Sequence, residues 1–333
     1  MMLTIKEIFE FLNGADDEWL YKKATEVKAG VYGDKVFIRG IIENNNICAR
    51  NCFYCGIRAE NSELVRYNLS QEQILECAQL IKKQNINSIV LQSGESDCVS
   101  DKELAQTIFK IKELTGADIT LSFGEKSFDI YKLWKEAGAD RYLLKIETLQ
   151  KDVYEYSHPG YKLKDRLKCL EDLQKLDYQV GSGFIWGLPL YTKEKMAQDL
   201  LNLQKIGVHM YSTTPLITSK NTPFENLACG DVETVYRSNA IYRLLEPKVN
   251  IPVASACASL DEKSKSKGLM RGANVLMLSF TPESVRKNYS IYRGKNIVAT
   301  EEISALKQIE VEIKNAGLVP SYTQGRSLYK RKK

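Results

Sequence analysis

The stretch Cys48-Ala49-Arg50-Asn51-Cys52-Phe53-Tyr54-Cys55 indicates both the chemistry and the fold of this chain. Its cysteines are separated by three and then by two residues, so their thiolates can converge from one loop on an iron-sulfur cluster, for which thiolates are the usual ligands. Three cysteines leave one iron of a cubane cluster open. Two alternatives remain, a zinc site with a further cysteine or histidine ligand and three unrelated buried thiols.

The rest of the chain is typical of a cytosolic protein with one large domain. Its 333 residues carry a formal charge of +5, with acidic and basic residues interleaved, so no nucleic-acid partner is expected. The basic run 330–333 is expected to be a solvated end. The start lacks a signal sequence, and no run approaches the ~18 apolar residues of a membrane span. Five scattered cysteines without ligand spacing are expected to be buried or incidental: Cys77, Cys98, Cys169, Cys229 and Cys257.

From residue 36 on, short apolar runs alternate with helical stretches, which is the pattern of βαβ units and a parallel sheet. We expect eight strands, at 36–42, 88–92, 118–122, 141–146, 179–185, 210–216, 251–255 and 273–278. Helices are expected at 70–84, 101–114, 128–137, 164–176, 193–206 and 232–245. The first of these begins with a capping box of Ser70 and Gln73. The pattern predicts an α/β protein with a (β/α)8 TIM-type barrel, whose chemistry lies at the C-terminal ends of the strands.

The two ends of the chain complete the predicted barrel. Residues 1–34 are expected to form an N-terminal cap of two short amphipathic helices over the bottom of the barrel. Residues 35–333 then form the barrel, a last helix at 301–316 that stops near Gly317 and Pro320, and the basic tail. No linker or repeat indicates a boundary, so we expect a single domain overall.

Polar residues follow the predicted strands at the level of the cysteine loop. Gln92-Ser93-Gly94-Glu95 end the second strand, where the glycine allows a close backbone approach. Thr120 and Ser122 end the third strand, and Lys145 and Glu147 end the fourth. Strand alternation places Lys145 and Glu147 on one side, and burying both charges requires a mutual ion pair or a charged ligand. These residues therefore form either a ligand site or ordinary turns with a structural ion pair.

Five further residues are candidates on weaker patterns. Arg166 begins a predicted helix, and its guanidinium either binds a carboxylate bidentately or stays a solvated charge. His158 and His209 are the only histidines, and we expect both to be structural. Tyr289 and Tyr292 follow the last predicted strand and either line the cavity or pack its rim.

The cysteine spacing, with the aromatic Tyr54 just before the last cysteine, resembles the signature of the radical SAM superfamily. The resemblance implies a [4Fe-4S] cluster on Cys48, Cys52 and Cys55, with S-adenosylmethionine (SAM) chelating the open iron. An electron from the cluster then breaks the sulfonium bond to give a 5′-deoxyadenosyl radical. The resemblance also implies that Tyr54 lies near the adenine. The other implied SAM contacts are Gln92, Ser93, Gly94, Glu95, Ser122, Lys145, Glu147 and Arg166.

The sequence is further similar to the biotin-synthase-like branch, and within it to the HydE family of [FeFe] hydrogenase maturases. The matching stretches span most of the barrel: 38–43, 48–58, 89–95, 120–125, 136–144, 183–189 and 272–275. This similarity implies that a SAM-derived radical acts on a small iron-carbonyl-cyanide-cysteine precursor of the hydrogenase's dinuclear subcluster. It also implies a cytoplasmic enzyme with reduced ferredoxin or flavodoxin as electron donor, other hydrogenase maturases as partners, and no membrane partner.

Departures from this family fall in the predicted cavity. The positions that border an anion pocket in the family match Thr120, Ala254 and Ser255, and Ala254 stands where the family has a hydroxyl residue. Residue 145 is a lysine where the family has arginine, which keeps the charge but loses the planar fork. Residues 210–217 differ from the usual glycine-rich version. The cysteines of a second, C-terminal cluster are missing, so one cluster is expected.

Two other functions stay open. A lysine mutase of the methylornithine synthase type would share the cluster and the barrel, but it needs carboxylate and ammonium clamps, and the sequence shows no clear set. A non-catalytic cluster carrier or scaffold would hold a cluster without cleaving SAM. The residues Gly94, Glu95 and Glu147 speak against a carrier, because the resemblance makes them SAM contacts.

Overall fold

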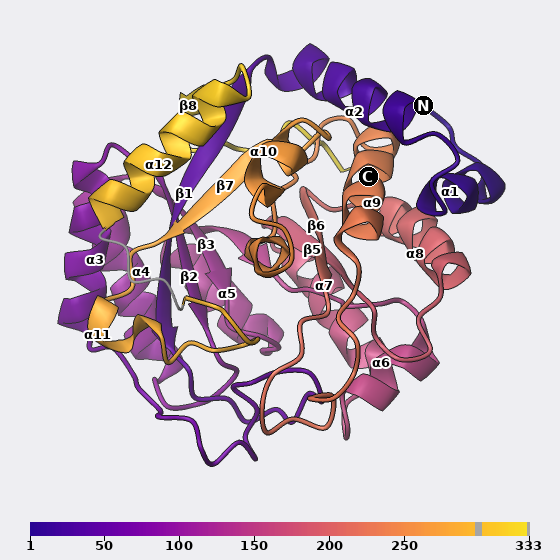
Figure 1. Cartoon of the computed structure of the whole chain (residues 1–333). Coiled ribbons are helices and arrows are strands. Elements are labelled where there is room, and N and C mark those ends of the chain that lie inside the picture. Colours follow the sequence, from indigo (N-terminus) through magenta and orange to yellow (C-terminus); the bar gives the residue numbers. More distant parts are fainter. Residues whose placement is uncertain (297–301, 332–333) are drawn as a thin grey trace.

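A computed structural model describes residues 1–296 and 302–331 of the chain. Glu301, the predicted first residue of the last helix, and residues 332–333 of the basic tail lie outside the described residues. The fold is a curled parallel sheet with helices on its outside, so the predicted α/β barrel architecture is confirmed (Figure 1).

Within the described residues, the sheet has the strand order β6-β5-β4-β3-β2-β1-β7, and the short β8 pairs with the start of β1. The strands are β1 (Lys35–Asn45), β2 (Ser88–Ser93), β3 (Asp118–Ser122), β4 (Ala139–Leu143), β5 (Gln179–Trp186), β6 (Met210–Pro215), β7 (Val275–Ser279) and β8 (Val319–Ser321). The pairings along this order are parallel. Their C-terminal ends therefore meet on one face of the barrel.

The strand predicted at 251–255 was wrong. Single parallel bridges join Asn250 to Met210 of β6 and Pro252 to Val275 of β7, and the chain then enters the 3-10 helix η1 (Ser255–Ser259). Residues 251–254 are all buried, and a short apolar run with the β-branched Ile251 and Val253 imitates a buried strand. Pro252 has no backbone N–H to extend a ladder, so the segment closes the gap between β6 and β7 without forming a strand.

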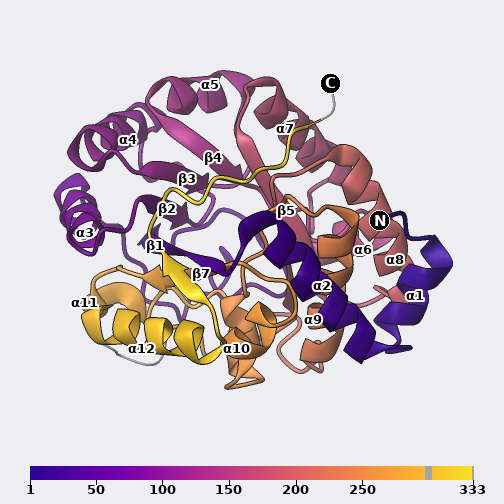
Figure 2. The same ribbon diagram turned by 90° about the horizontal axis from the view of Figure 1, so that it is seen from above.

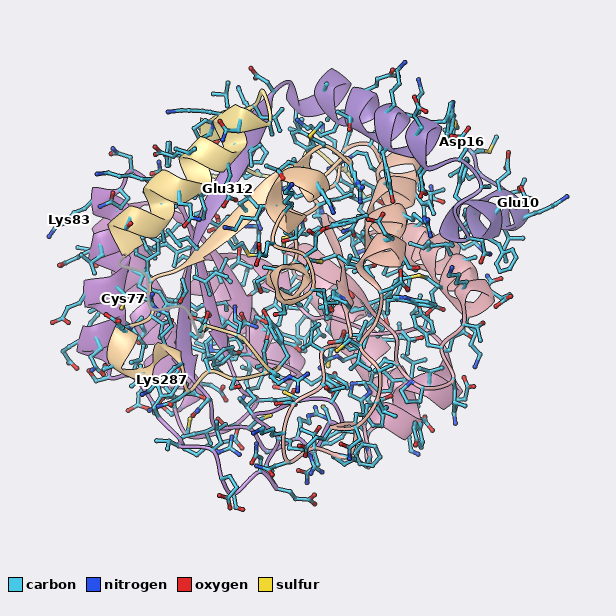
Figure 3. The ribbon with its side chains drawn as sticks, viewed as in Figure 1. Glu10, Asp16, Cys77, Lys83, Lys287 and Glu312 are labelled. Atoms are coloured by element: carbon cyan, nitrogen blue, oxygen red, sulfur yellow. The ribbon has the colours of Figure 1, made fainter. Side chains whose placement is uncertain are left out.

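The helices surround the sheet as a ring (Figure 2). They are α1 (Ile5–Leu12), α2 (Asp17–Tyr32), α3 (Gln71–Lys83), α4 (Asp101–Thr115), α5 (Phe128–Glu136), α6 (Lys151–Ser157), α7 (Leu163–Lys175), α8 (Lys193–Ile206), α9 (Val232–Leu245), α10 (Ser264–Leu269), α11 (Glu283–Arg286) and α12 (Glu302–Asn315). The predicted capping box is present, since Ser70 accepts from Gln73 N and Gln73 from Ser70 N. Apolar side chains such as Cys77 of α3 pack inward (Figure 3).

The two chain ends occupy different places at the bottom of the barrel. Helices α1 and α2 pack mainly on α8 and α9, while the segment after β8 crosses the bottom (Figure 2). The carbonyl oxygen of Gly325 accepts hydrogen bonds from Arg39 and Asn250 inside the barrel. Pro320, predicted to lie beyond the last element, is part of β8. The domain boundary after residue 34 stays a prediction. No described helix combines the length and apolar character that a bilayer crossing requires.

Candidate functional site

A cavity of about 340 Å³ lies at the C-terminal ends of the strands. The wall of this one cavity includes every residue that was predicted to hold the cluster, contact SAM or line the substrate pocket. These are Cys48, Cys52, Tyr54, Cys55, Gln92, Ser93, Gly94, Glu95, Thr120, Ser122, Lys145, Glu147, Arg166, Ala254, Ser255, Tyr289 and Tyr292. Residues from distant parts of the chain are thus brought to one place, as the barrel predicts.

The cysteine loop is held against its neighbours by backbone hydrogen bonds. Ala49 N donates to Glu95 O at 2.7 Å, and Phe53 N donates to Ser157 O at 3.0 Å. A Cβ atom at Gly94 would lie 2.1 Å from Ile47 O, so the glycine is needed for β2 to touch this loop. The predicted close approach at Gly94 is therefore made by the cysteine loop itself.

The three motif cysteines fit a cluster with three thiolate ligands. All three are free thiols that face the same cavity. Burial raises the pKa of the Cys52 thiol to about 12, and the neighbouring Cys48 adds to this effect. The thiolate form therefore requires a nearby positive charge, which bound iron supplies. Among residues 1–296 and 302–331, no three His, Cys, Asp or Glu side chains are grouped to hold a single metal ion.

A network of four charged side chains lies beside the cysteines. Arg50, inside the cysteine motif, donates from Nε to Glu95 Oε1 at 2.6 Å and lies 2.9 Å from Glu125 Oε2. Arg166 of α7 lies 3.3 Å from Glu125 Oε1. The guanidinium of Arg50 stacks 3.4 Å above the centre of the Tyr161 ring. We name these four charged residues, Arg50, Glu95, Glu125 and Arg166, the charged network.

Sequence reasoning missed half of the charged network. Arg50 stands between two motif cysteines, and Glu125 follows a glycine after a strand. These positions in the sequence could have indicated that both residues lie beside the cysteines. Gly124 has a φ of +74°, and a Cβ atom there would lie 1.9 Å from Glu95 Oε2. The glycine therefore makes room for the Glu95 carboxylate.

Lys145 and Glu147 face the cavity together as predicted, although β4 ends before them at Leu143. Lys145 Nζ lies 3.1 Å from Glu147 Oε2 and donates to Thr214 Oγ1 at 2.9 Å. The close contact with Glu147 Oε2 has no hydrogen-bond geometry. Within residues 1–296 and 302–331, this buried oxygen therefore has an opposite charge beside it but no hydrogen-bond donor. Glu147 also has a φ of +65°, a left-handed conformation that non-glycine residues seldom adopt.

Two features bind the Glu147 backbone in this conformation. Glu147 N donates to Gly183 O, and Ile185 N donates to Glu147 O, both at 3.0 Å. Arg166 donates from Nε and Nη2 to Lys145 O at 3.0 and 2.9 Å. The predicted helix residue Arg166 therefore braces the turn that carries Lys145 and Glu147.

Two buried arginines that were not predicted lie at the far end of the cavity: Arg39 lines the wall, and Arg141 lies behind the lining residue Thr120. Arg141 donates from Nε to Thr120 Oγ1 at 2.9 Å and lies 3.2 Å from Asp118 Oδ2. Arg39 contacts Met210 Sδ and Gly325 O, and its Nε has no hydrogen-bond partner in the part of the chain that the structure describes. A buried guanidinium with an unused donor is suited to an anionic ligand.

The remaining residues considered from the sequence are Tyr289, Ser255 and Tyr292 at the cavity wall and the two histidines. Tyr289 is almost fully buried, and Ser255 Oγ lies 2.8 Å from Tyr292 Oη at the cavity wall. Of the histidines, which were both predicted to be structural, His158 lines the cavity and its Nε2 lies 2.8 Å from Tyr54 Oη. His209 lies near the other end of β6, where its Nδ1 accepts from Val180 N at 3.2 Å.

Comparisons with known proteins agree with this geometry. Residues 43–203 match the model of the radical SAM superfamily. The [FeFe] hydrogenase maturase subunit HydE of Thermotoga maritima is 35% identical over 97% of this chain and 92% of its own. A biotin synthase of Clostridium botulinum is 26% identical over 82% of this chain and 86% of its own.

Two solved structures share the fold at lower identity. Methylornithine synthase (PylB) has a TM-score of 0.84 at 20% identity and covers 96% of this chain and 95% of its own. HydG, a maturase of the [FeFe]-hydrogenase, has a TM-score of 0.80 at 21% identity and covers 96% of this chain and 73% of its own. Members of the matching superfamily are enzymes that use a [4Fe-4S] cluster and SAM. This chain belongs to the radical SAM superfamily and, within it, to the family of the hydrogenase maturase subunit HydE.

Proposed function

We propose that this protein is a HydE-type enzyme, which acts with a SAM-derived radical during maturation of [FeFe] hydrogenase. The observation that carries the proposal is the single cavity shared by the three motif cysteines and the predicted polar residues at and after the C-terminal ends of β2, β3 and β4. The similarity to HydE of Thermotoga maritima, which covers 97% of this chain, supports the HydE type.

In this proposal, Cys48, Cys52 and Cys55 hold a [4Fe-4S] cluster. When bound, this cluster supplies the electron for reductive cleavage of SAM to a 5′-deoxyadenosyl radical. Tyr54, adjacent to the last cysteine, borders the adenine. The electron donor of the proposal is a reduced ferredoxin or flavodoxin.

The amino and carboxylate groups of SAM need partners of opposite charge. Glu95 and Glu147 are the proposed acceptors for its positive groups, and Lys145 and Arg166 the proposed donors for its carboxylate. Gln92, Ser93, Gly94 and Ser122 complete the proposed contacts along the ends of β2 and β3. The strained backbone of Glu147 supports its assignment, because such conformations cluster at functional sites.

The far end of the cavity is the proposed place of the substrate, a small iron-carbonyl-cyanide-cysteine precursor. Thr120 and Ala254 line it, and Arg39 offers its unpaired donor to a negative group. Ala254 contributes no hydroxyl, so Arg39 and Thr120 take a larger share of anion binding here. Enclosure by the barrel keeps water and stray hydrogen donors from the radical.

The test is anaerobic hydrogenase maturation in a defined mixture that contains the other maturases but lacks HydE. Adding the wild-type protein is expected to restore hydrogen production, and adding Cys52→Ala is not. Cys229→Ala is the matched control, because Cys229 is a free thiol outside the cavity wall. Iron content and 5′-deoxyadenosine formation are measured in parallel for each variant.

Two results would contradict the proposal at different levels. If Cys52→Ala still formed 5′-deoxyadenosine, the assignment of the cluster ligands would be wrong. If the wild type cleaved SAM but did not restore maturation, the HydE assignment would be wrong and the substrate would be another molecule. Lysine would then be tested, because methylornithine synthase has the same fold.

A further inference from the structure

Asp199 is a buried carboxylate that lies outside the cavity wall and is not among the proposed SAM contacts. It belongs to α8 in the outer ring of helices, and it has no exposed surface (Figure 2). Burial of a carboxylate is costly unless hydrogen bonds satisfy its oxygens. The groups that donate to Asp199 therefore show what this carboxylate holds in place.

Three donors to Asp199 come from the residues that directly follow Glu147 in the chain. Oδ2 accepts from Thr148 Oγ1 and from Leu149 N, both at 2.8 Å. Oδ1 accepts from Gln150 Nε2 at 2.5 Å. Hydrogen bonds to a charged acceptor are stronger than those between neutral groups. Asp199 thus ties the chain that leaves Glu147 firmly to α8.

Glu147 lies at the centre of a strained turn. Thr148 N donates to Ile146 O at 2.8 Å, and the φ of Glu147 between them is +65°. This arrangement is a γ-turn with a positive φ at its central residue, which is the rare and strained form. A strained backbone persists only where its surroundings hold it. β5 holds the backbone of Glu147 itself, and Asp199 holds the residues that follow the turn.

We propose that Asp199 is a positioning residue, which keeps the Glu147 carboxylate directed into the cavity for SAM. The inference rests on the proposed function, in which Glu147 accepts a positive group of SAM. Among the described residues, Glu147 Oε2 is a buried acceptor without a donor, so a donor of the ligand can use it. A turn released from α8 can relax to an ordinary conformation, and the carboxylate then moves away from the ligand.

The test measures SAM binding by anaerobic equilibrium dialysis on the cluster-loaded protein, without a reductant, so that SAM is not cleaved. Asp199→Asn keeps the shape of the side chain but has one uncharged oxygen in place of a carboxylate. It is expected to raise the dissociation constant for SAM about tenfold, while iron content stays at the wild-type level. Urea unfolding is measured in parallel. A merely structural carboxylate would change the free energy of unfolding and leave the dissociation constant unchanged, and that result would overturn the proposal.

Thr148→Val and Tyr191→Phe form a matched pair that decides the question even if Asp199→Asn does not fold. Each removes one hydroxyl donor from Asp199 Oδ2, because Tyr191 Oη also donates to this oxygen, at 2.9 Å. Only Thr148 adjoins Glu147, whereas Tyr191 lies between β5 and α8 and outside the cavity wall. Thr148→Val is expected to raise the dissociation constant for SAM about fivefold, and Tyr191→Phe to leave it within about twofold of the wild-type value. Equal effects of the two variants would mean a general loosening around α8 and would overturn the positioning role.

A double-mutant cycle with Glu147→Gln tests whether Asp199 acts through Glu147. Once the charge of Glu147 is removed, the position of its side chain matters less for SAM. Adding Asp199→Asn to Glu147→Gln is therefore expected to change the dissociation constant by no more than about twofold. Full additivity of the two substitutions would mean that Asp199 acts on SAM binding by another route.

Failure of the positioning role is separable from failure of the proposed function. A wild type that forms no 5′-deoxyadenosine in dithionite would refute the proposed function. A wild type that binds and cleaves SAM, with binding weakened in Glu147→Gln but unchanged in Asp199→Asn, would refute the positioning role alone. Unchanged binding in Glu147→Gln would refute both the SAM contact of Glu147 and the role of Asp199.

Discussion

The Tyr54 hydroxyl lies 2.8 Å from Nε2 of His158, and Nδ1 of the same ring lies 2.7 Å from the carbonyl oxygen of Tyr154. A carbonyl oxygen can only accept, so Nδ1 carries the ring proton and Nε2 accepts the hydrogen bond from Tyr54. Burial lowers the pKa of His158 to about 3, so the ring is neutral near pH 7. His158 therefore fixes the orientation of the tyrosine between the last two motif cysteines.

Replacing His158 by phenylalanine is expected to raise the KM for SAM about tenfold while iron content stays at the wild-type level. The change leaves the buried Tyr54 hydroxyl without an acceptor, and an unsatisfied buried donor costs about 1–3 kcal/mol. Adding Tyr54→Phe removes this orphan group, so the double variant is expected to bind SAM better than His158→Phe alone. The measurement is a double-mutant cycle on SAM affinity, and strictly additive effects would exclude the coupling.

Glu147→Gln is expected to weaken SAM binding about tenfold or more and to leave the cluster intact. The substitution keeps the shape of the side chain but removes the charge that faces Lys145 in the cavity. The measurement is the SAM dissociation constant, together with iron content. Glu171→Gln on the outer face of α7 is the control, because its exposed carboxylate pairs with the neighbouring Lys175 and lies outside the cavity wall. An unchanged SAM affinity in Glu147→Gln would remove Glu147 from the SAM site.

The sequence predicted the strand-end residues well because their positions follow from local patterns. An apolar run followed by Gly or a charged residue marks a strand end, and the barrel then places Gln92, Ser122 and Glu147 at one mouth. The same local reasoning failed at 251–255, where the buried apolar run with Ile251 and Val253 resembles a strand. Pro252, which cannot extend a ladder, and the position of the segment between β6 and β7 limit it to single bridges.

The cavity residues that the sequence did not reveal are placed there by contacts with residues distant in the chain. Lys295 lines the cavity 3.6 Å from Glu43, which lies more than 250 residues earlier in the chain, and no periodicity connects them. Arg39 had a weak signal, as a charged residue within an otherwise apolar strand. Its partners, Met210 and Gly325, come from another strand and from the C-terminal segment, so only the folded chain shows its place in the cavity.

The free energy of unfolding is expected to fall as pH decreases from about 6.5 toward 4, and His209 provides a test. Burial lowers the pKa of His209 to about 4 in the folded protein, against about 6.5 in an unfolded chain. In this window the unfolded state binds a proton that the folded state does not, so acid favours unfolding. His158, with its pKa of about 3, acts in the same direction.

The measurement is urea unfolding of the cluster-free protein at pH 7 and pH 5. His209→Gln keeps a side-chain acceptor for Val180 N and cannot titrate. We expect its loss of stability between the two pH values to be smaller than that of the wild type by about 1–2 kcal/mol. An identical loss in the two proteins would mean that His209 does not titrate with a lowered pKa.

Gly325→Ala is expected to reduce the free energy of unfolding by about 2 kcal/mol or more, because two costs combine at this position. Gly325 has a φ of +57°, in the region where a side chain costs about 1 kcal/mol. A Cβ atom there would also lie 2.8 Å from Cγ of the Phe37 ring, and Phe37 is buried in β1. Overpacking of this kind adds about 1–3 kcal/mol.

Gly317→Ala separates the two costs. Gly317 has a similar φ of +71°, but a Cβ atom there would meet open space, so only the backbone cost of about 1 kcal/mol is expected. Urea unfolding of both variants measures the difference, which reports the contact between the C-terminal segment and β1. Equal destabilisation of the two variants would mean that the C-terminal segment can move away from Phe37 without a cost in free energy. A larger effect of Gly325→Ala would show that the C-terminal segment is packed firmly across the barrel bottom, where it supplies the Gly325 carbonyl to Arg39.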